Sequence, residues 1–111
     1  MTVQRMAMVI GVRPEKLAEY KALHASPWPE MNAALNAANI HNYSIYLREP
    51  ENLLFGYWEY TGTDYAADMK LLDSLAVSEK WLALTDPCQA KLPTAPADEK
   101  WSFMPEVFHL D

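Results

Sequence analysis

Tyr20 and His24 are the residues of this 111-residue chain whose types and spacing are best suited to chemistry. They are four positions apart, so a helix through this region places them next to each other on one face. An imidazole with an ordinary pKa of about 6.5 can hold or release a proton at neutral pH, which is what general acid–base catalysis requires. His24 is therefore the candidate catalytic residue.

Aromatic residues indicate what this histidine could act on. Trp28 follows it between two prolines, and Tyr43 and Trp81 occur later in the chain. Aromatic rings stack on the C–H face of a sugar, and hydroxyl and indole N–H groups reach its hydroxyls. We take Tyr20, Tyr43, Trp81 and Trp28 as candidate substrate-binding residues. The alternative is structural, because aromatic residues at helical spacing usually belong to a core and a lone histidine often does too.

Other kinds of site have little support in the sequence. The three histidines, His24, His41 and His109, are widely separated, and no H-x-x-x-H or C-x-x-C pair could anchor a metal. Glycine-rich nucleotide-binding motifs and G-x-S-x-G are absent as well. We expect neither a metal nor a nucleotide cofactor. His41 either assists the site or braces a strand.

Prolines and turn residues divide the chain into elements that position these residues. Strands are predicted over residues 3–12, 40–47, 53–60 and 107–110. Helices are predicted from Pro14 through His24, over 28–38, over 64–74 and over 78–85, with a loop over 90–99. The order β-α-β-β-α-β, with each helical section doubled, predicts an α+β, ferredoxin-like antiparallel sheet with helices on one face. We expect one domain over residues 1–111.

Both faces of the central strands carry apolar or aromatic residues. Regular alternation along residues 40–47 places His41, Tyr43, Ile45 and Leu47 on one face and Asn42, Ser44 and Tyr46 on the other. Helices cover only one face of such a sheet, so the second face needs a cover. A second copy packed sheet to sheet would supply it, and we expect a homodimer.

Charge and hydropathy exclude several classes of partner. The formal net charge is −6, with 15 acidic and 9 basic residues and no basic run. Nucleic acid and anionic lipid surfaces are therefore not expected partners. We identify neither a signal peptide nor an apolar run of membrane-spanning length, and the single cysteine, Cys88, suits a reducing compartment. These features predict a cytoplasmic protein.

Several segments, taken in their order and spacing, resemble the L-rhamnose mutarotase family over essentially the whole chain. The matching segments are residues 19–24, 28–30, 41–47 and 52–55, Trp81 ahead of Thr85–Asp86, and residues 106–110. The resemblance implies a dimeric α+β barrel of the ferredoxin-like kind. It also implies an enzyme that interconverts the α and β anomers of L-rhamnose without a cofactor or metal.

The same resemblance implies individual roles. His24 corresponds to the family's catalytic proton donor, and Tyr20 and Tyr43 correspond to its sugar-binding tyrosines. Trp81 corresponds to the first of a tryptophan pair, whose second position is Leu82 in this chain. Because one stacking ring is missing, L-fucose, another 6-deoxy hexose, is an alternative substrate. A dimeric α+β barrel monooxygenase and a non-catalytic sugar-binding protein are the alternative functions.

Overall fold

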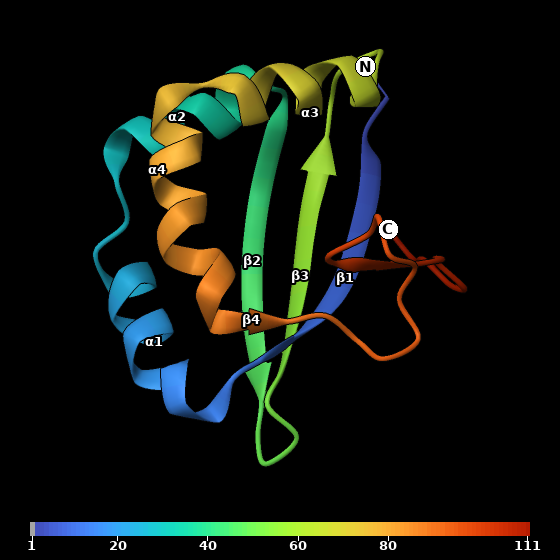
Figure 1. Ribbon diagram of the computed structural model, residues 1–111. Helices are drawn as coiled ribbons and strands as arrows, with labels where there is room; N and C mark the ends of the chain where they lie inside the picture. Colours follow the sequence, from blue (N-terminus) through green and yellow to red (C-terminus); the bar gives the residue numbers. More distant parts are fainter. Residues whose placement is uncertain (1) are drawn as a thin grey trace.

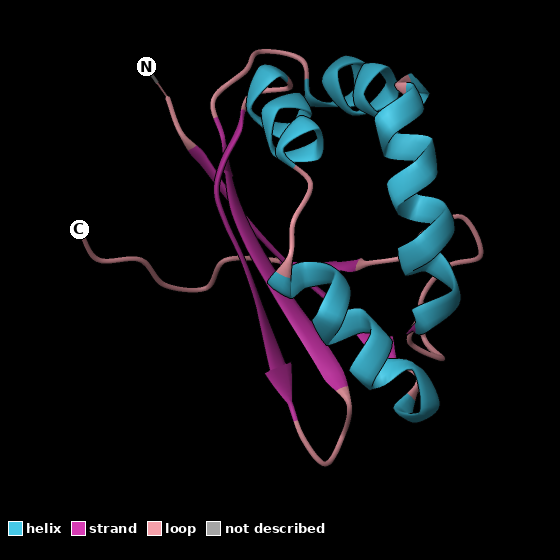
Figure 2. Cartoon of the chain, turned by 90° about the vertical axis from the view of Figure 1, so that its left-hand side faces the viewer, coloured by secondary structure: helices cyan, strands magenta, loops and turns pink. Residues whose placement is uncertain are grey.

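The computed structural model describes residues 2–111. These residues form one antiparallel sheet with helices on one of its faces (Figures 1 and 2). The strands are β1 (Gln4–Val12), β2 (Ile40–Arg48), β3 (Leu53–Tyr60), β4 (Gln89–Ala90) and β5 (Ser102–Met104). The helices are α1 (Leu17–Ala25), α2 (Pro29–Ala37), α3 (Tyr65–Ser74) and α4 (Ala76–Thr85), with short 3-10 helices at Pro14–Lys16 and Asp86–Cys88. The predicted α+β order with doubled helical sections is confirmed.

The strand β1 lies inside the sheet. The strand order is β2-β3-β1-β4, and β5 also pairs with β1. One edge of β1 pairs with β3 over Gln4–Gly11, while the other edge is shared between β5 and β4. Every pairing is antiparallel, so the sheet is of the ferredoxin-like kind that the sequence predicts.

Two hydrophobic clusters lie between the sheet and the helices. The first contains Ile10, Val12, Tyr20, Leu54 and the free, buried Cys88. The second contains Met31, Ala38 and Leu72, with Trp28 and Trp81 packed against it. Each large apolar side chain buried in this way contributes about 1.5–3 kcal/mol. Core packing therefore holds Tyr20, Trp28 and Trp81, three of the five candidate site residues.

Strand β2 contains a β-bulge that overturns the regular alternation predicted for it. His41 pairs with Glu59 and Ser44 pairs with Tyr57, so three steps along β2 match two steps along β3. Asn42, at φ 49°, lies in the left-handed region within this bulge, and its side chain donates to Glu59 Oε1 at 2.8 Å. The extra residue moves His41 to the face away from the helices. The prediction that His41 shares a face with Tyr43 is wrong.

The predicted final strand over residues 107–110 is also wrong. The last strand is β5, which pairs Ala7 with Met104 and Val9 with Ser102. Residues 107–110 lie beyond this pairing and have no partner strand, so Val107 remains 95% exposed and Phe108 77% exposed. Figure 2 shows the C-terminal segment leaving the sheet on the side opposite the helices.

Candidate active site

Helix α1 brings Tyr20 and His24 together as the sequence predicts. Their rings stack with centroids 4.2 Å apart, and His24 Nδ1 lies 2.9 Å from the Tyr20 carbonyl oxygen. Because a carbonyl oxygen only accepts, Nδ1 carries the hydrogen in this bond. The same bond holds the imidazole against its own helix. In the neutral ring, Nε2 is then the nitrogen with a free lone pair.

Two tryptophans from different helices continue the aromatic cluster. Trp81 of α4 meets the His24 ring edge to face at 5.2 Å, and Trp28, at the start of α2, meets Trp81 at 5.1 Å. Such edge-to-face pairs add roughly 0.5–1.5 kcal/mol beyond burial. The imidazole is thus fixed on one side by Tyr20 and on another by Trp81.

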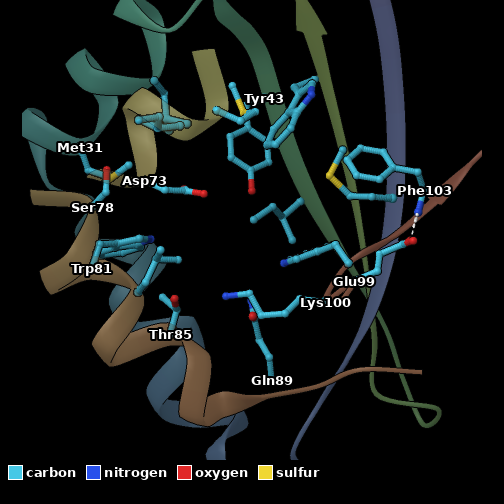
Figure 3. A pocket seen from close by; sticks show the side chains of 18 of the residues that line it. Met31, Tyr43, Asp73, Ser78, Trp81, Thr85, Gln89, Glu99, Lys100 and Phe103 are labelled. Carbon is cyan, nitrogen blue, oxygen red and sulfur yellow. Dashed lines mark hydrogen bonds between the residues drawn. The ribbon is translucent and has the colours of Figure 1, made fainter. Parts of the chain in front are cut away.

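Tyr43 reaches the same region from the sheet. Its ring packs edge to face against Trp58 of β3 at 5.0 Å. Figure 3 shows its hydroxyl pointing into the space that Trp81 and Ser78 border from α4 and that Lys100 borders from the segment between β4 and β5. The structure therefore brings together residues from two helices and the sheet.

A cavity of about 390 Å³ lies between the helices and the sheet at this point. Tyr20, His24, Tyr43 and Trp81 all line it. Trp28 lines a second cavity of about 320 Å³, which shares His24, Tyr43 and Trp81 with the first. Four of the five candidate residues thus lie on the larger cavity, and Trp28 lies behind Trp81.

The cavity also has lining residues that sequence reasoning missed. Among them are the polar or aromatic residues Tyr65, Asp73, Ser78, Thr85, Gln89 and Lys100. One signal was available, since Ser78, Trp81, Leu82 and Thr85 follow the i, i+3, i+4, i+7 spacing of one helix face. Lys100 gives no such signal, because it reaches the cavity from an irregular segment and is held there by Asp86 at 2.7 Å.

Burial raises the pKa of the tyrosine hydroxyls around the cavity. The pKa of Tyr20 rises to about 12, an effect that the Gln89 side chain opposes in part. Burial also raises the pKa of Tyr65 to about 12. The pKa of Tyr43 is raised by burial and, to a lesser extent, by the neighbouring Tyr20 and Tyr65. These phenols keep their protons throughout the neutral range and can donate hydrogen bonds to a ligand.

The raised pKa of Tyr20 predicts a loss of stability in alkali. In the unfolded chain the phenol ionises near its ordinary pKa of 10.0, whereas in the folded protein it resists ionisation up to about 12. The free energy of unfolding therefore falls as the pH rises through this interval. We expect Tyr20→Phe to flatten this fall relative to the wild type, as measured by urea unfolding at a series of pH values. Parallel curves for the two proteins above pH 10 would contradict the assignment.

Two further structural findings bear on the kind of site. Over residues 2–111, we find no group of three or more His, Cys, Asp or Glu side chains placed to hold a metal ion. Within the same described range, every helix is too short or too polar to cross a membrane.

Comparison with known proteins gives the family of the chain. The L-rhamnose mutarotase family model matches residues 5–110. The L-rhamnose mutarotase of Oceanobacillus iheyensis is 34% identical over 98% of this chain and 100% of its own length. That of Ligilactobacillus salivarius is 36% identical, and the match covers 100% of both chains.

Solved structures agree with the fold. The crystal structure of an L-rhamnose mutarotase from Formosa agariphila has a TM-score of 0.76 at 23% identity, covering 97% of this chain and 99% of that chain. A putative antibiotic biosynthesis monooxygenase from Bordetella bronchiseptica has a TM-score of 0.64 at 16% identity, covering 99% of this chain and 100% of that one. At these low sequence identities, the two structural similarities establish only the fold. By its sequence match, which spans nearly every residue, the chain belongs to the L-rhamnose mutarotase family.

Proposed function

We propose that this protein catalyses the interconversion of the α and β anomers of L-rhamnose by general acid–base catalysis, without a cofactor. The observation that carries the proposal is His24, an imidazole on the wall of a cavity that Tyr20, Tyr43 and Trp81 also line. Membership of the L-rhamnose mutarotase family supports L-rhamnose as the substrate.

The chemistry of anomer interconversion sets the role of each site residue. Opening the pyranose requires a proton on the ring oxygen while the anomeric hydroxyl loses one. Rotation about the C1–C2 bond then turns the aldehyde, and the ring oxygen attacks the opposite face of the carbonyl to close the ring as the other anomer. We propose that His24 Nε2 exchanges the proton with the ring oxygen, because Nδ1 is already bonded to the Tyr20 carbonyl. A group of this kind contributes about 10²- to 10⁴-fold, which suits a reaction that already proceeds in water.

The other candidate residues bind and orient the sugar in this mechanism. Tyr20 and Tyr43 donate hydrogen bonds to sugar oxygens, in keeping with the raised pKa of both phenols. Trp81 offers a ring for stacking on the C–H face of the pyranose. Trp28 supports Trp81 by their edge-to-face contact and borders the sugar from the smaller cavity.

Leu82 makes L-fucose the second candidate substrate. It lines the larger cavity at the position beside Trp81, where the family resemblance places a second tryptophan. A leucine leaves more room than an indole and removes one stacking surface, so that a 6-deoxy hexose of different configuration could be accommodated.

Proton NMR tests the proposed activity directly. Saturation of one anomeric signal of L-rhamnose at equilibrium is expected to transfer to the other anomer when the protein is present. The same measurement on L-fucose ranks the two sugars. Absence of transfer for both would contradict the proposal. Sugar binding without transfer would then indicate a binding protein, and oxygen consumption with a reduced aromatic substrate would indicate a monooxygenase.

We further propose that the active form is a cytoplasmic homodimer that packs the uncovered sheet faces together as a dimeric α+β barrel. On that face Tyr46, Phe55 and Val9 lie side by side across β2, β3 and β1, and Tyr46 is 66% exposed. The exposed Val107 and Phe108 extend to the same side (Figure 2). Val9 is already buried, and a second copy would bury Tyr46, Val107, Phe108 and the exposed part of Phe55. The free, buried Cys88 suits a reducing cytoplasm.

A further inference from the structure

Ser78 carries a buried hydroxyl that the protein itself leaves without a partner. The residue is 1% exposed, and its Oγ is the one buried side-chain nitrogen or oxygen in residues 2–111 that makes no hydrogen bond. A buried hydroxyl without a partner carries a desolvation penalty, so nearly all such groups in folded proteins are paired. The missing partner of Ser78 requires an explanation.

The position of Ser78 suggests that the partner comes from a bound molecule. Ser78 lines the larger cavity together with His24 and Trp81. It lies in the first turn of α4, on the helix face that also carries Trp81 three residues later. Figure 3 shows Ser78 and Trp81 on the same side of the cavity.

The geometry of α4 fits the size of a pyranose. The Trp81 ring touches His24, where the proposed proton exchange takes place, and Ser78 lies about one helical turn from Trp81. One turn, about 5.4 Å, is comparable to the separation of hydroxyls on opposite sides of a sugar ring. A sugar that stacks on Trp81 with its anomeric end at His24 would extend its far side along α4, where Ser78 lines the same cavity.

We infer that Ser78 Oγ forms a hydrogen bond with a ring hydroxyl of the sugar remote from the anomeric carbon, at C3 or C4, and so selects substrates by that hydroxyl. The inference rests on the proposed mutarotase function and assigns a specificity residue to it. A serine hydroxyl donates and accepts, as a sugar hydroxyl does, so the pair satisfies both groups. A site built around such a bond rejects sugars that lack the hydroxyl, because Ser78 is then left unpaired again.

The test compares Ser78→Ala with the wild type in the NMR exchange assay and in thermal unfolding. We expect kcat/KM for L-rhamnose to fall by about 3- to 10-fold, the value of one hydrogen bond. The melting temperature of the free protein should stay the same or rise, because the removed hydroxyl had no partner. Ser74→Ala is the matched control. Ser74 is exposed and bonded to the Leu71 carbonyl, and its loss should leave kcat/KM unchanged.

Deoxy sugars complete the test. For the wild type, 3-deoxy- or 4-deoxy-L-rhamnose should lose the same factor as the serine substitution, and Ser78→Ala should not discriminate against that sugar any further. An unchanged kcat/KM in Ser78→Ala, or a lower melting temperature with unaltered sugar preference, would overturn the inference while leaving the mutarotase function intact. Failure of the wild type to exchange any sugar would overturn both.

Discussion

Replacing His24 with alanine should lower the protein-catalysed rate of anomer exchange by about 100-fold or more, since a positioned general acid–base group contributes about 10²- to 10⁴-fold. The effect should appear mainly in kcat, because Tyr20, Tyr43 and Trp81 still line the cavity that binds the sugar. The fold should survive, because His24 is only half-buried and lies near the end of α1. Exchange NMR measures the rate, and circular dichroism checks the helices.

His41→Ala is the matched control for this substitution. It also removes an imidazole, but His41 lies on the face of the sheet away from the helices and lines neither cavity. We expect its exchange rate to stay within a few-fold of the wild type. A His24→Ala protein with near-normal activity would remove the imidazole from the mechanism. Equal losses in both variants would indicate a general effect on the fold.

Placing a charge on the uncovered sheet face should separate the proposed dimer into monomers. Phe55 lies between Tyr46 and Val9 on this face, at the centre of the apolar row. In Phe55→Asp a buried carboxylate would face its own copy across the interface without a partner. We expect the dimer dissociation constant to rise by about 30-fold or more, as at interface hot spots. Sedimentation velocity at micromolar concentration measures the change.

Leu71→Asp serves as the control for Phe55→Asp. Leu71 is apolar and 65% exposed, but it lies on α3, which is on the helical side of the sheet. This variant should sediment like the wild type. A monomeric wild type would refute the proposed dimer outright, and dissociation of the Leu71→Asp variant would place the interface on the helices.

The parts of the site that depend on local geometry could be predicted from the sequence. The contact between Tyr20 and His24 follows from four-residue spacing within one helix, and Pro14 marks where the helical section begins. The paired strands β2 and β3 follow from their aliphatic and aromatic content on either side of a polar turn. These features need no knowledge of the rest of the chain.

The parts that depend on distant segments could not be predicted in the same way. Strand β5 has only three residues, and it forms because β1 offers an unpaired edge at Ala7–Val9. The more apolar residues 107–110 gave the stronger strand pattern but have no edge to pair with. Tyr65 and Lys100 enter the cavity through tertiary packing, and no spacing in the sequence connects them to His24.

The bulge at Asn42 has a consequence for how this strand can change. Ile40 belongs to the protein interior and Tyr43 to the cavity, and an odd separation in a regular strand would turn them to opposite faces. The extra residue reconciles the two requirements. A regular strand of the same length would force a choice between exposing an isoleucine and withdrawing a phenol from the cavity, whereas deleting Asn42 would shorten their separation to two residues and leave both facing the helices. Stability and sugar recognition are thus joined here by the number of backbone residues, independently of which side chains they carry.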